Sequence, residues 1–359
     1  MEEMRTCSLS KQASKQASKQ ASKQASKQAS KQADISLLRI VATIAVVFLH
    51  TNSTLTEHQE LFQQTGSQYN FFLCSHLVLH WAVPVFLMIT GALLLKKEKV
   101  ITYGICIKKY CKRILLALFI FGVPFSMIEL FISRRSVSWT MPLQSLMNVI
   151  TGNSFSHLWY LYALIGLYLV LPFFKAALDD MSEVQLQIFL LILFIFAFCL
   201  PCLEMIGVEI AFTVPITYTA FYAVLGKYLY EKDGHISKFI CLLALLVCLI
   251  VVCVFRIDGY DHPITAVESI CIFLLFKGLN VKNEVRKQRL WKLDRLCFGV
   301  YLIHPVFIHF TYRVLKISPI SFGDMYCLMM FVFGVAYIAC AFMGSWLMAK
   351  IKPLREYVL

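Results

Sequence analysis

Long apolar runs separated by short polar loops dominate the chain from residue 34 onward. A helix that crosses a membrane needs about 20 mainly apolar residues, and about ten runs of that kind occur here. They lie near residues 35–53, 73–95, 114–132, 157–174, 186–203, 210–230, 237–255, 263–280, 295–312 and 326–348. The pattern predicts an all-α integral membrane protein whose spanning helices form one bundle.

The start of the chain has a different pattern. Residues 10–33 repeat the tetrapeptide SKQA, without any aromatic residue, branched apolar residue or glycine. Such a segment cannot bury a core, and lysines four residues apart repel one another on a helix face. We expect residues 1–33 to be a disordered cytoplasmic tail, 34–350 to be the membrane domain, and 351–359 to be a short cytoplasmic tail.

The repeat suggests a further hypothesis at the level of the gene. The codons AAG CAA GCA AGC encode Lys-Gln-Ala-Ser and consist of three copies of the tetranucleotide AAGC. A tract of this kind is prone to slippage and would switch the reading frame on and off, which is phase variation. Mixed synonymous codons across the repeat would contradict this hypothesis.

Composition and charge narrow the class of protein. The chain is 59% hydrophobic and 15% charged, whereas an average soluble domain has about 25% charged residues. This excludes an ordinary soluble enzyme and a wholly disordered chain. The net charge of +13 does not indicate nucleic-acid binding, because most Lys and Arg residues lie in loops on the side of the N-terminus. The opposite side carries only Arg134, Arg135, Arg256, Arg313 and Lys316. The positive-inside rule therefore predicts that both termini are cytoplasmic.

Two polar side chains lie inside the first apolar run, ISLLRIVATIAVVFLH. At 100° per residue, the eleven residues from Arg39 to His50 bring the chain to within roughly 20° of three full turns, about 16 Å along the axis. Both side chains thus share one helix face, with Arg39 toward the cytoplasm. A charged residue inside a membrane usually faces a polar interior, but Arg39 could also snorkel to lipid phosphates while His50 sits at the interface.

Four segments together resemble the membrane acyltransferase-3 family. They are the Arg-x10-His helix at 34–50, WAVPVFLMITGALLL at 81–95, HLWYLYALIGLYLVLP at 157–172, and FGVYLIHP at 298–305. The likeness spans roughly residues 34–350. It implies transfer of an acyl group, usually acetyl, from cytoplasmic acyl-CoA to a hydroxyl of a cell-surface sugar at the outer face of the membrane.

The resemblance also implies roles for residues and partners. His50 matches the family histidine and would be the general base, while Arg39 would hold the phosphates or carbonyl of the donor. The expected partners are acetyl-CoA as donor substrate, a surface glycan or lipid-linked sugar as acceptor, and membrane lipid, with no nucleic acid and no permanently bound cofactor. A bacterial inner-membrane location and a lipooligosaccharide acceptor follow by association.

Members of the family often carry an Arg-x-x-Arg pair before the third span, where this chain has KKYCKR. Lys109, Lys112 and Arg113 are the candidates for binding acyl-CoA there. Lysine can bind phosphate as a point charge. Each of the three could instead be an anchor on the cytoplasmic side.

Other polar residues in the spans are open to two interpretations. Glu129 and Glu268 fall toward the outer half, where either could orient His50 or only line a cavity. His304 precedes Pro305, so it could be catalytic or could sit at a structural kink. His76 and His80 share a helix face, but a metal site needs further ligands, and no acid lies close in sequence. We therefore expect interface histidines and no metal.

Two functions other than catalysis remain open at this stage. A transporter or flippase for a glycan or lipid also has many spans and buried charge, although it usually shows inverted repeats, which are not evident here. A non-catalytic component of a polysaccharide-synthesis complex would leave Arg39 and His50 dispensable.

Overall fold

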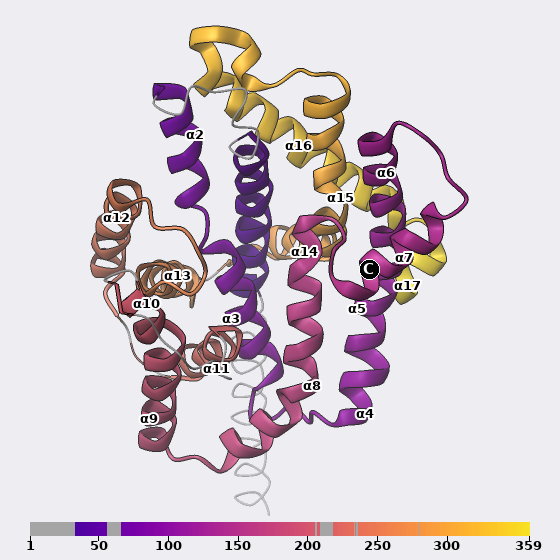
Figure 1. Ribbon diagram of the computed structural model, residues 1–359. Coiled ribbons are helices and arrows are strands. Elements are labelled where there is room, and N and C mark those ends of the chain that lie inside the picture. Colours follow the sequence, from indigo (N-terminus) through magenta and orange to yellow (C-terminus); the bar gives the residue numbers. More distant parts are fainter. Residues whose placement is uncertain are drawn as a thin grey trace, which may run out of the picture.

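The computed structural model describes residues 33–55, 66–204, 207–208, 218–232, 234, 236–279 and 281–359. This part of the chain consists of helices and loops, with no strand in it (Figure 1). The N-terminal helix is Ala33–Leu55. The later α-helices are α2 (Ser67–Leu77), α3 (Ala82–Leu94), α4 (Tyr103–Ile105), α5 (Lys112–Ala117), α6 (Val123–Arg134), α7 (Met141–Thr151), α8 (Trp159–Asp180), α9 (Glu183–Phe194), α10 (Leu200–Glu204), α11 (Tyr218–Glu231), α12 (Lys238–Phe255), α13 (Pro263–Phe276), α14 (Glu284–Asp294), α15 (Cys297–His309), α16 (Tyr326–Met348) and α17 (Lys352–Tyr357).

Short π-helical or 3-10 segments join several of these helices. The π-helical segments are Cys106–Cys111, Leu118–Gly122, Ile195–Cys199 and Phe310–Val314, and the 3-10 segments are Ser156–Leu158 and Pro319–Met325. The SKQA repeat, apart from Ala33, lies outside the described residues. The disordered tail and the phase variation therefore stay predictions.

Among the described residues, 7 helices are long and apolar enough to cross a membrane. They are Ala33–Leu55, Ser67–Leu94, Tyr103–Arg134, Trp159–Asp180, Glu183–Leu203, Lys238–Phe255 and Pro319–Met348. The number is 8 if the bent pair formed by α14 and α15 is counted as one span. The chain is thus a multi-pass membrane protein, as predicted.

The predicted count of about ten spans is not confirmed. The described part of α11 and the whole of α13 have 14 residues each, which at 1.5 Å per residue is about 21 Å, short of a bilayer core of about 30 Å. Residues 210–217 of the sixth predicted span lie outside the described residues. The cytoplasmic location of both termini stays a prediction.

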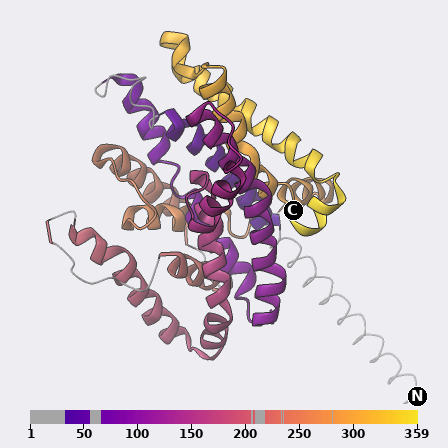
Figure 2. The ribbon, with the colours of Figure 1, turned by 45° about the vertical axis from the view of Figure 1, so that its right-hand side comes forward.

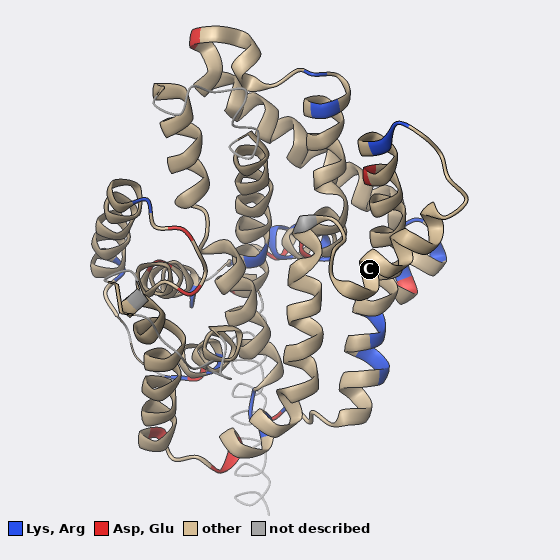
Figure 3. Cartoon of the chain, in the orientation of Figure 1, with Lys and Arg blue, Asp and Glu red and all other residues tan. Residues whose placement is uncertain are grey.

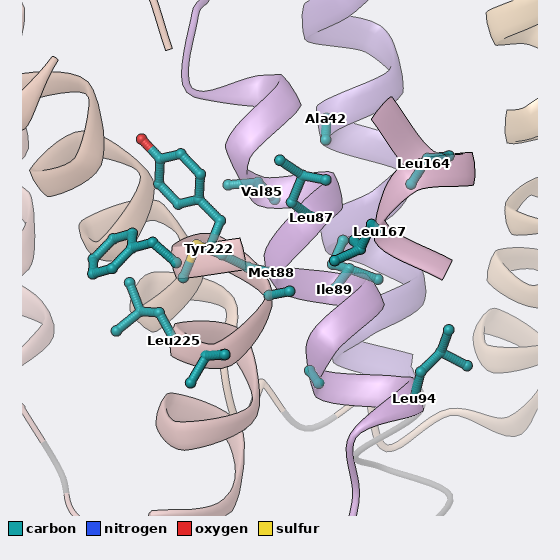
Figure 4. Close-up of a cluster of buried hydrophobic side chains, with 14 of the residues drawn as sticks. Ala42, Val85, Leu87, Met88, Ile89, Leu94, Leu164, Leu167, Tyr222 and Leu225 are labelled. Atoms are coloured by element: carbon teal, nitrogen blue, oxygen red, sulfur yellow. The ribbon is translucent and has the colours of Figure 1, made fainter. Parts of the chain in front are cut away.

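The core is centred on α3, which packs against α11 on one side and faces the N-terminal helix and α8 on the other. Figure 4 shows Val85, Met88 and Ile89 of α3 among side chains from these neighbours. A Cβ on Gly91 would lie 1.7 Å from the carbonyl oxygen of Ala223, and one on Gly226 would lie 2.0 Å from that of Met88. Two glycines therefore let the backbones of α3 and α11 approach closely, as small residues do between membrane helices.

The charged side chains are not spread evenly over the bundle. Figure 3 shows Lys and Arg along the lower half of the helix that includes α4 and α5, and around α14 in the centre of the view. Helices α14 and α15 meet at an angle of 53°. The chain ends beside α5 in both ribbon views (Figures 1 and 2).

Candidate active site

The N-terminal helix places Arg39 and His50 beside two adjoining cavities. Arg39 lines a cavity of about 1100 Å³, whereas His50 lines a small one of about 20 Å³, which has room for roughly one water molecule. Phe86 of α3, Tyr160 of α8 and Tyr301 of α15 line both cavities. The cavities of Arg39 and His50 are therefore neighbours that share a wall of three aromatic rings.

Arg39 is held by an acidic residue from the far end of the chain. Its guanidinium lies 2.6 Å from Oδ1 of Asp294, and the hydroxyl of Ser36 donates to Oδ2 of the same carboxylate at 2.9 Å. Asp294 is the last residue of α14, at the bend before α15. Asp294 is not among the site residues predicted from the sequence. Its only sequence signal is that it is an acid in a basic segment just before a predicted span.

The three basic candidates before the third span differ in where they lie. All three are exposed, but Arg113 lines the large cavity, whereas Lys109 and Lys112 do not. The Nε of Arg113 donates to the carbonyl oxygen of Val358 at 2.7 Å, and its guanidinium lies 5.0 Å from the centre of the Phe298 ring.

Lys99, which the sequence analysis did not single out, also lines the large cavity. Partial burial, followed by the nearby ammonium groups of Lys109 and Lys96, lowers the pKa of Lys99 below its ordinary value. Arg295 and Arg355 add two more cations to the wall. The large cavity thus combines apolar walls with several cations, which suits a long ligand that carries phosphates.

Three histidines lie close together, and two of them, His50 and His157, line the small cavity. The ring of His50 lies 5.1 Å from that of His304 and 6.2 Å from that of His157, and the latter two are 5.6 Å apart, all between ring centres. His157 precedes α8, and His304 lies in α15. The structure therefore brings the predicted His50 and His304 together. It adds His157, whose sequence signal was its place at the head of the third family-like segment.

Hydrogen bonding fixes the orientation of the His304 ring. Its Nδ1 lies 3.1 Å from the carbonyl oxygen of Val300 and 2.9 Å from that of Tyr301, so Nδ1 carries the proton and Nε2 keeps a lone pair. That Nε2 and both ring nitrogens of His157 are buried without a partner among the described residues. Buried polar atoms normally have partners, so these nitrogens are available for a proton or hydroxyl that enters the cavity.

Neither predicted carboxylate lies with this cluster. Glu129 is paired with Arg313, whose Nη1 lies 2.7 Å from Oε2. Glu268 is fully buried, and its electrostatic neighbours include Tyr222 and Cys271 rather than a histidine. Neither carboxylate has a contact with His50 in the part of the chain that the structure describes.

A comparison with protein-family models matches residues 32–350 to the acyltransferase domain of the acyltransferase-3 family. The chain belongs to this family. The matched range contains both cavities except for Arg355 and Leu359 of the larger one. Comparisons with curated proteins and with solved structures give no match. The acyltransferase-3 chain described here is therefore a multi-pass membrane acyltransferase.

Proposed function

We propose that this protein moves an acetyl group from cytoplasmic acetyl-CoA to a hydroxyl of a surface glycan at the outer face of the bacterial inner membrane. One observation carries the proposal. A single helix presents Arg39 to a large cationic cavity and His50 to a small histidine-lined cavity, and the two share an aromatic wall. This arrangement suits a donor that enters from one side and an acceptor that enters from the other.

The large cavity is the proposed donor site. Arg39, Arg113 and Lys99 would bind the phosphates of the donor, and the aromatic wall would guide its thioester toward His50. Asp294 would neutralise Arg39 while the cavity holds no donor, because an unpaired charge inside a membrane is costly. Lys109 and Lys112 then serve as cytoplasmic anchors.

The small cavity is the proposed site of acyl transfer. A ring nitrogen of His50 takes the proton of the acceptor hydroxyl, and the hydroxyl oxygen forms a bond to the thioester carbonyl carbon. The carbon–sulfur bond then breaks, and the sulfur takes the proton from His50, so that the products are an ester and free coenzyme A. His304 and His157 would stabilise the protonated imidazole through their free lone pairs.

The experiment compares the wild-type protein with His50→Ala in a host that makes the acceptor glycan but does not acetylate it. Base-labile acetyl groups on the glycan are measured by mass spectrometry, and the membrane abundance of both proteins is matched. We expect acetylation with the wild type only. Acetylation that persists with His50→Ala would remove His50 from the mechanism.

Purified protein in liposomes separates transfer from transport. We expect acetyl-CoA to be consumed inside the liposome and acetyl ester to appear outside, on glycan added outside. Movement of unmodified glycan without acetyl transfer would instead indicate a transporter.

A further inference from the structure

A second group of polar residues lies outside the two cavities, on α2, on the turn before α3 and on the loop after α12. His76, His80 and Asp258 each offer one ligand atom, and the three atoms all lie within 4.8 Å of one another. The loop is held there by contacts on both sides of the group. Arg256 donates to Asn70 of α2 at 3.0 Å, and Ile257 packs against Leu77.

The two nitrogens of His80 both face oxygen acceptors. Its Nδ1 lies 3.0 Å from the carbonyl oxygen of Leu77, and its Nε2 lies 3.0 Å from Oδ1 of Asp258. With the proton on Nδ1, the lone pair of Nε2 points at a carboxylate, which is unfavourable. Either a second proton or a cation must therefore lie between Nε2 and Asp258.

His76 decides between these two explanations. Its Nδ1 is buried without a partner among the described residues, and its ring lies 4.6 Å from that of His80 between centres. A second proton on His80 would satisfy only the pair with Asp258 and would leave Nδ1 of His76 without a partner. A divalent cation would satisfy all three side chains at once.

The donor set and its geometry match a particular class of ion. Two imidazoles and one carboxylate are ligands that zinc accepts, and ligand atoms about 2.0–2.2 Å from a tetrahedral ion are roughly 3.4 Å apart. Here Nε2 of His80 and Oδ1 of Asp258 are 3.0 Å apart, and no two of the three ligand atoms are more than 4.8 Å apart. The hydrogen bond from His80 Nδ1 to a backbone carbonyl is the outer contact that orients a metal-binding histidine.

We propose that His76, His80 and Asp258 bind a divalent transition-metal ion of the zinc class. Three protein ligands leave the fourth position open to water or another oxygen ligand. Asp258 comes from the loop and the histidines from α2 and the following turn, so the ion would tie this loop to the bundle. Tyr260, two residues after Asp258, lines the small cavity beside His50. The ion would therefore hold one wall of that cavity in place.

The test measures metal binding by the full-length protein in detergent micelles, purified without a histidine tag. The protein is stripped with a chelator, dialysed against a trace of Zn²⁺, and analysed for bound zinc by mass spectrometry. Asp258→Asn, His76→Gln and His80→Gln are compared with Asp261→Asn, a matched control whose carboxylate is outside the group. We expect one equivalent of zinc in the wild type and the control, and at least a 100-fold weaker affinity in each of the three variants.

Two further readouts keep the test independent of variant folding and of activity. Cobalt added to the stripped wild type should give the visible absorption of a four- or five-coordinate site, and zinc should raise the melting temperature of the wild type and the control only. Zinc binding by the wild type far below one equivalent, or an octahedral cobalt spectrum alone, would overturn the proposal. Equally tight binding by Asp258→Asn would also overturn it.

Discussion

Arg39 and Asp294 form an ion pair of 2.6 Å between residues that are 255 positions apart in the chain. The pair joins the first third of the N-terminal helix to the bend between α14 and α15. Both side chains are mostly buried, with 27% and 15% of their surface exposed. Removal of one partner from a buried pair leaves the other charge without compensation, whereas loss of both can be nearly neutral.

A double-mutant cycle tests whether this pair acts as a unit. We expect Arg39→Met and Asp294→Leu each to lower the melting temperature of the protein in detergent, and the double variant to be more stable than Asp294→Leu alone. The coupling should be about 0.5–3 kcal/mol, the range found for residues in one charged network. Additive effects of the two substitutions would mean that each residue contributes independently. Arg39→Met and the double variant should lose acetyl transfer, because both lack a cation of the proposed donor site.

The sequence could predict that Arg39 and His50 share a face, because the α-helix fixes the angle per residue. It could not predict Asp294 or His157 as their neighbours, because contacts across the bundle depend on how helices pack. The same limit explains why Glu129 and Glu268 were candidates to orient His50, although neither contacts it in the structure. Their depth in the membrane could be estimated from the ends of the spans, but the direction of each side chain around its helix could not.

Local backbone irregularities account for other differences. The segment Cys106–Cys111 is π-helical, which changes the angle between successive residues and weakens any prediction of which basic side chain faces inward. The eighth predicted span, 263–280, ends earlier because α13 stops at Phe276 and Gly278 follows with φ of +73°. A left-handed glycine commonly ends a helix, but an apolar run by itself does not reveal where it does so.

His50 and His304 should differ in how strongly they affect the chemical step. We expect His50→Ala to lower kcat by about 10²–10⁴, the usual contribution of a general base, and His304→Ala to lower it less. Neither variant should weaken binding of a non-hydrolysable donor analogue, since the large cavity is intact. Single-turnover rates and equilibrium binding in liposomes measure the two quantities separately. A parallel loss of donor binding would indicate a structural role instead.

Gly91 gives a prediction about stability that is independent of the chemistry. A Cβ at this position would meet the backbone carbonyl of Ala223, which cannot move aside as a flexible side chain can. We expect Gly91→Ala to destabilise the protein by about 1–3 kcal/mol or more, as overpacking does, with a lower melting temperature in detergent. Gly166→Ala is the matched control, because nothing lies within 4 Å of a Cβ placed there. Equal melting temperatures for the two variants would contradict the close approach of α3 and α11.

Arg113 and Lys112 are neighbours in sequence that should behave differently. Arg113 lines the large cavity and Lys112 does not. Arg113→Ala is therefore expected to raise KM for acetyl-CoA about tenfold, which corresponds to about 1.4 kcal/mol, with a smaller effect for Arg113→Lys. Lys112→Ala should leave KM unchanged. A larger effect at Lys112 would assign phosphate binding to the exposed face instead.

Lys99 makes donor binding depend on pH in a defined direction. Because its pKa is lowered by burial and by Lys109 and Lys96, Lys99 loses its proton at a lower pH than an ordinary lysine. A bound phosphate favours the charged ammonium and raises that pKa again. By linkage, donor affinity is highest at a pH below the pKa of Lys99 in the free protein. It falls as the pH rises from that pKa toward the higher pKa of Lys99 in the complex. Arginine at this position would stay charged throughout. We therefore expect KM for acetyl-CoA in the wild type to rise as the pH is raised toward the ordinary lysine pKa of about 10.4, and to rise less in Lys99→Arg. The same rise in both proteins would show that another group controls the pH dependence.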